Sequence, residues 1–236
     1  MEQIKYRYDF TFKDGRSESF TVVLDGSTLD PVEPLPQKLP EWTRLHFERC
    51  RNCSLDPLDH SYCPLAGRLE PVLSKMINVL SHENVDVEVT LDERSITRSC
   101  TAQEGLSALM GIITATSGCP NTSFFKPMAR FHLPFANTEE TFYRATSMYM
   151  LGQYYRWHND KGFDMDMKGL LKFYEGISQV NRGMSNRIKA EQREDGAINA
   201  LVLLDMFAMT IPESMDEILD SMEPLFEPYI NAERVL

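Results

Sequence analysis

The sequence predicts an α+β protein with β-hairpins in its N-terminal part and a predominantly helical C-terminal half. Three observations support this fold class. Apolar and polar residues alternate over residues 4–12, 20–24 and 85–91, as in half-buried strands. Four prolines separate the first segment from the rest of the chain. Beyond about Met165, apolar residues recur at the spacing of amphipathic helices.

A β-hairpin is predicted over residues 1–26. Alternate positions of its first strand are apolar: Ile4, Tyr6, Tyr8, Phe10 and Phe12. Side chains of a strand alternate between the two faces of a sheet, so this pattern buries one face. Residues 13–16, with the sequence Lys-Asp-Gly-Arg, form the turn, and alternation resumes at Phe20.

The segment 27–40 is predicted to be an extended connector, because its four prolines lack amide donors and have restricted backbone angles. The remaining segment, 41–236, is predicted to be the main body, folded with the hairpin as one compact unit. It begins with a short helix over 41–50, followed by a polar loop from Cys53 to Cys63. Apolar residues then repeat at helical spacing from Leu65 to Leu80, where Pro71 favours a kink or a second helix start.

A second hairpin is predicted over residues 85–101, and a helix over 103–116 follows it. This helix is apolar around much of its circumference, which predicts a buried position. Gly118 is placed to end it. Asn137 and Glu140 predict a capping box at the start of a long aromatic helix.

Composition limits the function classes. The formal net charge is −11, and residues 195–236 contain nine acids and one base. Such a surface repels phosphate backbones, so no nucleic-acid partner is expected. We find no apolar signal core and no run approaching about 18 apolar residues, so we expect a cytoplasmic protein without a membrane partner. The aromatic and acidic helical half is the expected surface for a protein partner, and a homo-oligomer or a small-molecule partner remains open.

Three cysteines provide the only spacing that predicts specific chemistry. Cys50 and Cys53 form a C-x2-C pair, and nine residues separate Cys53 from Cys63. Two thiolates on one turn are a common half of a tetrahedral metal site, and a flexible loop lets a third sulfur fold back. Soft thiolate ligands favour zinc or an iron–sulfur cluster. We therefore predict a metal-binding protein whose zinc is structural, and an iron–sulfur protein is an alternative.

The fourth ligand must come from elsewhere in the chain. Its candidates are Cys119, His46, His60 and His132. Cys100 is a weaker candidate because it lies in a predicted strand. With four fixed protein ligands the site is closed and structural, and the protein is a binding or regulatory module.

Catalytic alternatives follow from other residues near the predicted site. With one exchangeable ligand, a zinc-bound water beside Glu139 or Glu140, His132 and Arg130 would make the protein a zinc-dependent hydrolase. A redox role for Cys50 and Cys53 is less favoured, because the pair follows a predicted helix and no βαβ pattern surrounds it. Cys119 is disfavoured as a nucleophile paired with His132, because the partial negative charge of a helix C-terminus destabilises a thiolate.

Several motifs together resemble an uncharacterised bacterial family. They are the C-x2-C pair, Cys63 with the following proline, Ser117–Pro120, Pro127–Phe135 and Glu140–Arg144. The resemblance covers most of the chain, and that family has no assigned activity. It implies that Cys119 belongs with Cys50, Cys53 and Cys63. It also implies roles beyond packing for Arg130, His132 and the segment 140–144.

Overall fold

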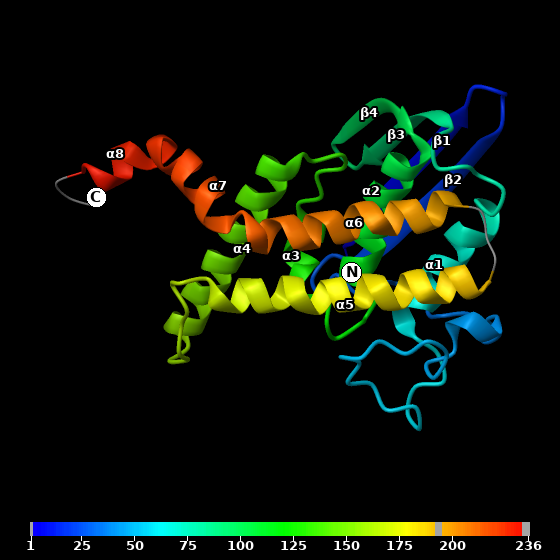
Figure 1. The fold of residues 1–236 in the computed structure, drawn as a ribbon, viewed down its shortest axis with the longest axis horizontal. Coiled ribbons are helices and arrows are strands. Elements are labelled where there is room, and N and C mark those ends of the chain that lie inside the picture. Colours follow the sequence, from blue (N-terminus) through cyan, green and yellow to red (C-terminus); the bar gives the residue numbers. More distant parts are fainter. Residues whose placement is uncertain (1, 192–194, 233–236) are drawn as a thin grey trace.

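The computed structural model describes residues 2–191 and 195–232, and it has the predicted α+β architecture (Figure 1). The described residues form a four-stranded antiparallel sheet in the order β2-β1-β3-β4. The strands are β1 (Gln3–Phe12), β2 (Ser17–Asp25), β3 (Asn84–Leu91) and β4 (Arg94–Thr101). The α-helices are α1 (Pro64–Lys75), α2 (Ala102–Thr116), α3 (Lys126–Arg130), α4 (Thr138–His158), α5 (Lys168–Ala190), α6 (Asp195–Glu213), α7 (Met215–Met222) and α8 (Glu227–Ile230). Three short 3-10 helices are η1 (Glu41–Thr43), η2 (Ser123–Phe125) and η3 (Glu223–Phe226).

The N-terminal hairpin belongs to the same sheet as the second hairpin. β1 lies between β2 and β3, and Phe10 of β1 is opposite Val87 of β3. Burial alternates along β1, as the sequence pattern predicted. The buried face of the sheet therefore presents one continuous apolar surface to the helices.

Helix α2 packs closely on this face of the sheet. A Cβ added at Gly105 would lie 2.8 Å from Phe10 Cε1 and 2.9 Å from Val87 Cγ2. Thr101 and Glu104 form a capping box that fixes the helix start directly after β4. The predicted burial of this helix is confirmed, and its C-terminal end is placed inside the molecule.

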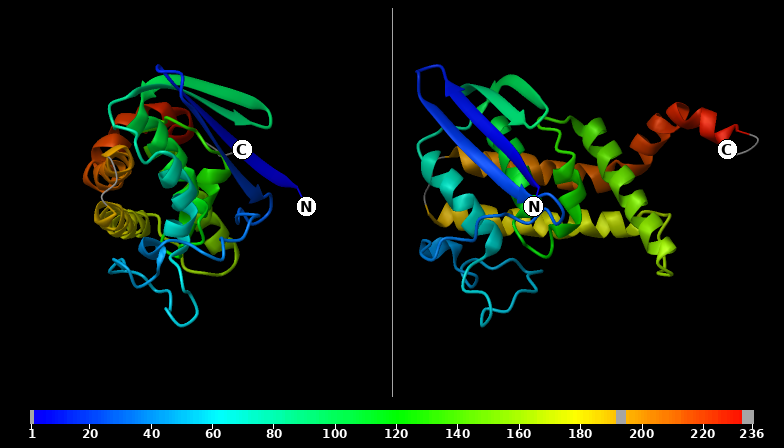
Figure 2. Two further views of the ribbon diagram at one scale, coloured as in Figure 1. Left: turned by 90° about the vertical axis from the view of Figure 1, so that its right-hand side faces the viewer. Right: turned by 180° about the vertical axis from the view of Figure 1, so that it is seen from behind.

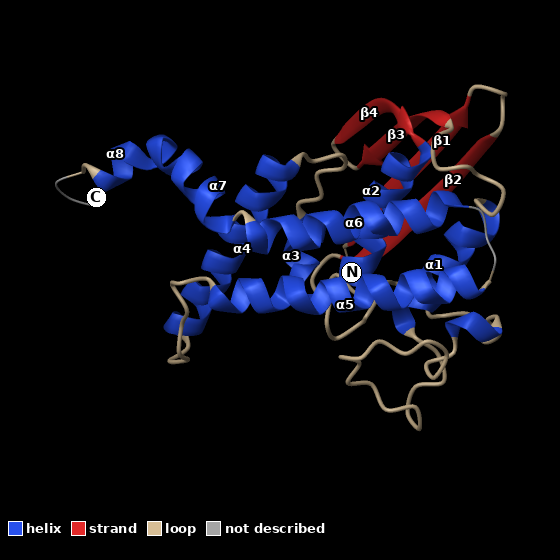
Figure 3. Cartoon of the chain, in the orientation of Figure 1, coloured by secondary structure: helices blue, strands red, loops and turns tan. Residues whose placement is uncertain are grey.

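Helices α5 and α6 run lengthwise in opposite directions, and α6 packs along both α2 and α5 (Figures 1 and 3). Helix α6 is long and apolar enough, by length and composition alone, to span a membrane. In the fold, part of the apolar surface of α6 packs against α2 and α5. The chain then leaves the body as α7 and α8, which project to one side (Figure 2).

The predicted helix over 41–50 is wrong beyond Thr43, where η1 ends. The chain continues in turns, and Arg44 forms an isolated β-bridge with Tyr62. Glu48 has a positive φ of 40°, which interrupts helical geometry. Helix α1 also ends earlier than predicted, at Lys75, and it continues through Pro71 without a second start.

Two predicted helix ends are confirmed. Gly118 has a φ of 90°, the left-handed conformation that commonly follows a helix C-terminus. Asn137 accepts a hydrogen bond from the Glu140 amide, and the Glu140 carboxylate accepts one from the Asn137 amide, both at 2.8 Å. The capping box therefore defines the start of α4.

Candidate metal centre

Four of the five cysteines come from three segments of the chain and gather in one region of the fold. Cys50 and Cys53 lie in the loop before α1, Cys63 lies at the start of α1, and Cys119 lies in the turn after α2. Burial, followed by smaller contributions from Cys63, Cys119 and Cys53, raises the pKa of Cys50 to about 12. Burial also raises the pKa of Cys119, with smaller contributions from Cys63 and Cys53. The four sulfurs are thus within electrostatic reach of one another.

The same sulfurs do not stand in coordination geometry. Among residues 2–191 and 195–232, no three His, Cys, Asp or Glu side chains are arranged to hold a metal ion. All five cysteines are free thiols. A tetrahedral centre here requires the sulfurs to move closer, to about 2.3 Å from a common zinc ion.

Cys63 lies at a helix start that partly offsets the effect of burial on its thiol. It is the residue before the first turn of α1, and Pro64 follows it as the first helical residue. Burial raises the Cys63 pKa, whereas the amides of Ala66 and Leu65 lower it. These amides belong to the N-terminal turn of α1, whose partial positive charge stabilises negative charge.

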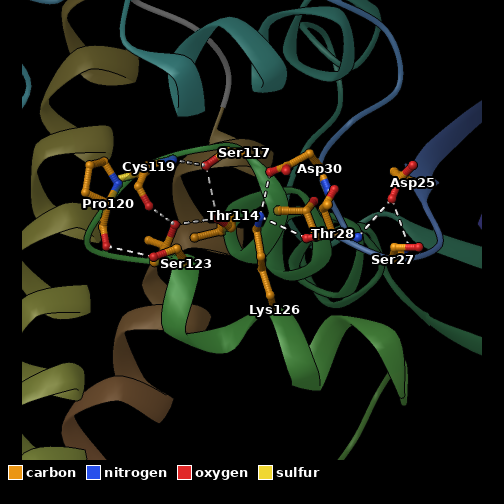
Figure 4. A network of polar contacts seen from close by, with 12 residues as sticks. Asp25, Ser27, Thr28, Asp30, Thr114, Ser117, Cys119, Pro120, Ser123 and Lys126 are labelled. Atoms are coloured by element: carbon orange, nitrogen blue, oxygen red, sulfur yellow. Dashed lines mark hydrogen bonds and ion pairs between the residues drawn. The ribbon is translucent and has the colours of Figure 1, made fainter.

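The turn carrying Cys119 is fixed to the end of α2 by side-chain hydrogen bonds (Figure 4). The Cys119 amide donates to Ser117 Oγ at 3.2 Å, and Ser117 Oγ donates to the Thr114 carbonyl at 3.1 Å. Thr122 Oγ1 donates to the same carbonyl at 2.7 Å. The Cys119 backbone is therefore held in place by buried groups, and the C-terminal carbonyl of Thr114 is satisfied.

Two asparagines join the cysteine loop to its neighbours. Asn121 Nδ2 donates to the Asn52 carbonyl at 3.1 Å, which links the turn after α2 to the C-x2-C segment. Asn52 Nδ2 donates to the Gly176 carbonyl of α5 at 2.9 Å. These bonds place Cys50 and Cys53 between the Cys119 turn and α5.

Helix α5 packs against the loop that carries Cys50 and Cys53. A Cβ added at Gly183 would lie only 2.5 Å from Cys50 Sγ. One turn further, Arg187 is 1% exposed, and its guanidinium favours thiolates at Cys50 and Cys63 by lowering their pKa values. The sequence analysis missed both residues.

Arg187 also fixes the chain that leads to Cys50. Its Nη1 donates to the carbonyls of Trp42 and Arg44, each at 2.7 Å, and its Nη2 donates to the Leu45 carbonyl at 3.2 Å. These bonds satisfy carbonyls that a helix over 41–50 would have used internally. They are the physical reason why the predicted helix is replaced by turns.

The other predicted ligands lie elsewhere. Cys100 is opposite Val85 in the sheet, and burial followed by the Glu104 charge raises its pKa to about 11. His46 lies 3.2 Å from Glu41 at the surface, and His60 is exposed in the loop. Among the described cysteines, the mutual pKa effects connect the four predicted sulfurs and leave Cys100 apart.

The residues of the hydrolase alternative are also placed. His132 Nε2 is hydrogen-bonded to the Tyr8 hydroxyl. Burial, followed by the charge of Arg144, lowers the His132 pKa to about 3. Glu140 is engaged in the capping box, and the neighbouring Glu139 is exposed. The carbonyl of Arg130 accepts a hydrogen bond from Tyr6 at 3.1 Å. Among the residues of the hydrolase alternative, His132 is therefore a neutral imidazole that packs against the sheet.

The fold and the site define an α+β protein with a cysteine cluster between the end of α2, the start of α1 and the middle of α5. The chain belongs to the family described as a domain of unknown function (DUF6901), whose model matches residues 4–227. The expected membership of an uncharacterised family is confirmed to that extent. No curated protein matches the chain significantly, and no solved structure does.

Proposed function

We propose that the protein binds one zinc ion through Cys50, Cys53, Cys63 and Cys119, and that the ion has a structural role in a binding or regulatory module. The observation that carries the proposal is the placement of four cysteines from three distant parts of the chain within electrostatic reach of one another. Unpaired thiols rarely cluster without a redox or metal role, and four sulfurs suit zinc.

The surroundings support a negatively charged centre. Four thiolates around a divalent cation carry two surplus negative charges, which buried sites must balance. The buried Arg187 guanidinium supplies one positive charge close to Cys50 and Cys63. The amides of Ala66, Leu65 and Asn121 supply polar hydrogens beside Cys63 and Cys119. Such outer contacts orient ligands and adjust a metal's affinity.

The movement required on binding falls on the segment best able to make it. Cys63 and Cys119 are attached to the ends of α1 and α2, whereas Cys50 and Cys53 lie in a loop of turns. Closure of this loop onto the two fixed sulfurs would complete the tetrahedron. The zinc would then join the loop over residues 50–63 to the C-terminal end of α2.

The test is elemental analysis of protein purified without added metal, together with its visible spectrum. We expect about one zinc per chain and no colour. Cys53→Ser, Cys63→Ser and Cys119→Ser should each lose zinc and melt at lower temperature. Cys100→Ser is the matched control and should retain zinc.

Other outcomes separate the alternatives. Absence of any metal, or zinc retained by Cys53→Ser, would reject the site. Iron with broad visible absorption would replace zinc with an iron–sulfur cluster. Zinc retained by Cys119→Ser alone would leave three sulfurs and an exchangeable position, which is the arrangement that the hydrolase alternative requires.

A further inference from the structure

A second feature lies on the other side of α5 from the cysteines. It is a pocket of about 440 Å³ between α2, α4, α5 and α6 and the segment that joins α3 to α4. This volume is within the range of sites that enclose small organic molecules. Most of the wall is apolar, with Ile112, Ile177, Leu204 and Phe207 as examples. The pocket shares no cysteine with the candidate metal centre.

Two buried polar side chains that line this pocket each have one atom without a hydrogen-bond partner among the described residues. Asn181 is 2% exposed, and its Nδ2 has no hydrogen-bond acceptor among the described residues. Thr114 is 6% exposed, and its Oγ1 is likewise unpartnered in the described part of the chain. An unpaired buried polar group is costly, so its persistence beside a cavity indicates a partner that occupies the cavity.

The pocket also contains a partly buried cation. Arg144 of α4 donates to the carbonyls of Met128 and Phe131, at 2.8 and 3.0 Å. Burial lowers its pKa, whereas Tyr174 and then the charge of Glu140 raise it, and none of the described carboxylates lies within ion-pair distance of its guanidinium. Arg144 is electrostatically coupled to Tyr174, which lies on the same face of α5 as Asn181.

These groups define the two ends of a ligand. Tyr174 and Asn181 are seven residues apart, or about 10 Å along a helix axis. Arg98 also lines the pocket, but it pairs with Glu104 at 3.7 Å, which leaves Arg144 as the cation of the lining without an ion pair among the described residues. One such guanidinium matches a planar anion of single charge, whereas a phosphate dianion would need further cations or amides. The Asn181 amide at the far end requires a hydrogen-bond acceptor.

We propose that this pocket binds an elongated organic monocarboxylate with an apolar body and a second hydrogen-bonding group. Arg144 and Tyr174 hold the carboxylate, and Asn181 and Thr114 hold the second group. His132 lines the wall as a hydrogen-bonded neutral ring beside the carboxylate end. The proposal is independent of the metal centre, because it uses none of its ligands.

The experiment is calorimetric titration of the purified protein with three probes that share a ten-carbon chain: 10-hydroxydecanoate, decanoate and 1,10-decanediol. We expect 10-hydroxydecanoate to bind about tenfold more tightly than decanoate, which lacks the hydroxyl. It should also bind at least about tenfold more tightly than the diol, which lacks the charge. No binding of any probe, or equal binding of all three, would overturn the proposal.

Variants assign the two ends. Asn181→Leu should remove the preference for 10-hydroxydecanoate over decanoate, because leucine offers no donor to the hydroxyl and packs at least as well as the amide against the apolar end of decanoate. Arg144→Gln should remove the preference for decanoate over an uncharged analogue, 1-decanol. Thr141→Phe should block all probes, because Thr141 lines the pocket. Arg182→Gln, beside Asn181 but exposed, is the matched control and should bind as wild type.

Two measurements distinguish a variant that does not fold from one that folds but no longer binds the probe. The Asn181→Leu protein should melt no lower than wild type, since leucine replaces an unpartnered amide of similar size. Its zinc content should equal that of wild type. If Asn181→Leu is folded and still distinguishes 10-hydroxydecanoate from decanoate, the assignment of the far end is wrong.

Discussion

Gly183 faces Cys50 so closely that a Cβ at position 183 would lie 2.5 Å from the Cys50 sulfur. Real Cβ atoms do not approach sulfur to this distance, so any larger residue must displace the thiol. The glycine is therefore required by the position of Cys50, and it is the most direct link between α5 and the candidate metal centre.

The first prediction concerns this contact. Gly183→Ala should displace Cys50 and weaken zinc retention by about tenfold or more, as measured by competition with a chelator. Gly152→Ala is the matched control, because Gly152 is also helical and has no atom within 4 Å of an added Cβ. It should leave zinc unchanged and raise the free energy of unfolding by about 1 kcal/mol. Equal zinc affinity in both variants would contradict the prediction.

The second prediction concerns Arg187. Arg187→Met should lower the free energy of unfolding by about 3 kcal/mol or more, because buried carbonyls of Trp42, Arg44 and Leu45 lose their donor. The measurement is urea unfolding of the metal-free protein. Lys189→Met, at an exposed position on the same helix, should change stability little. A loss for Arg187→Met no larger than that of the control would show that the guanidinium does not support the 41–50 segment.

The third prediction is a pH dependence caused by His132. Its pKa is about 3 in the fold, against an ordinary value of 6.5. The unfolded chain therefore binds a proton that the folded protein excludes between these pH values. The free energy of unfolding should fall with decreasing pH, beginning near pH 6.5, by up to about 1.4 kcal/mol per pH unit from this residue.

Urea unfolding of the metal-free protein at pH 7, 6 and 5 measures this slope. His132→Gln, which retains a hydrogen-bonding group for Tyr8, should reduce it. His46→Gln, at an exposed site, should keep the wild-type slope. Identical slopes in all three proteins would exclude His132 as the source.

The fourth prediction tests the start of α4. Asn137→Ala removes the side chain that accepts the Glu140 amide and should cost about 1 kcal/mol of stability. Asn186 is exposed, lies away from the ends of α5 and has no capping role. Asn186→Ala should therefore leave stability unchanged or raise it slightly. Thermal unfolding of the two variants compares them directly. Equal melting temperatures would contradict a stabilising cap.

The predictable parts of the fold are those that depend on neighbouring residues. The alternation from Ile4 to Phe12 identifies a strand because its burial repeats every second residue. Asn137 with Glu140 identifies a helix start for a similar reason. The 41–50 segment could not be predicted in this way, because its carbonyls are bound by Arg187, more than 140 residues away.

In the candidate site, too, the residues that could be predicted are those with a local sequence signal. The C-x2-C spacing of Cys50 and Cys53 is a local signal, whereas Gly183 and Arg187 have no motif and are found only in the fold. The pocket was missed because its polar groups come from α2, α4 and α5. One signal was present: Asn181 interrupts the apolar stripe of α5 between Ile177 and Met184.

Helix α5 contacts the cysteine loop through Gly176, Gly183 and Arg187, and it lines the pocket through Tyr174, Ile177 and Asn181. A helix moves as a nearly rigid rod, so a displacement toward one neighbour is a displacement away from the other. Helix α5 is thus a wall common to both sites, and a substitution that shifts this helix would alter the cysteine region and the pocket together.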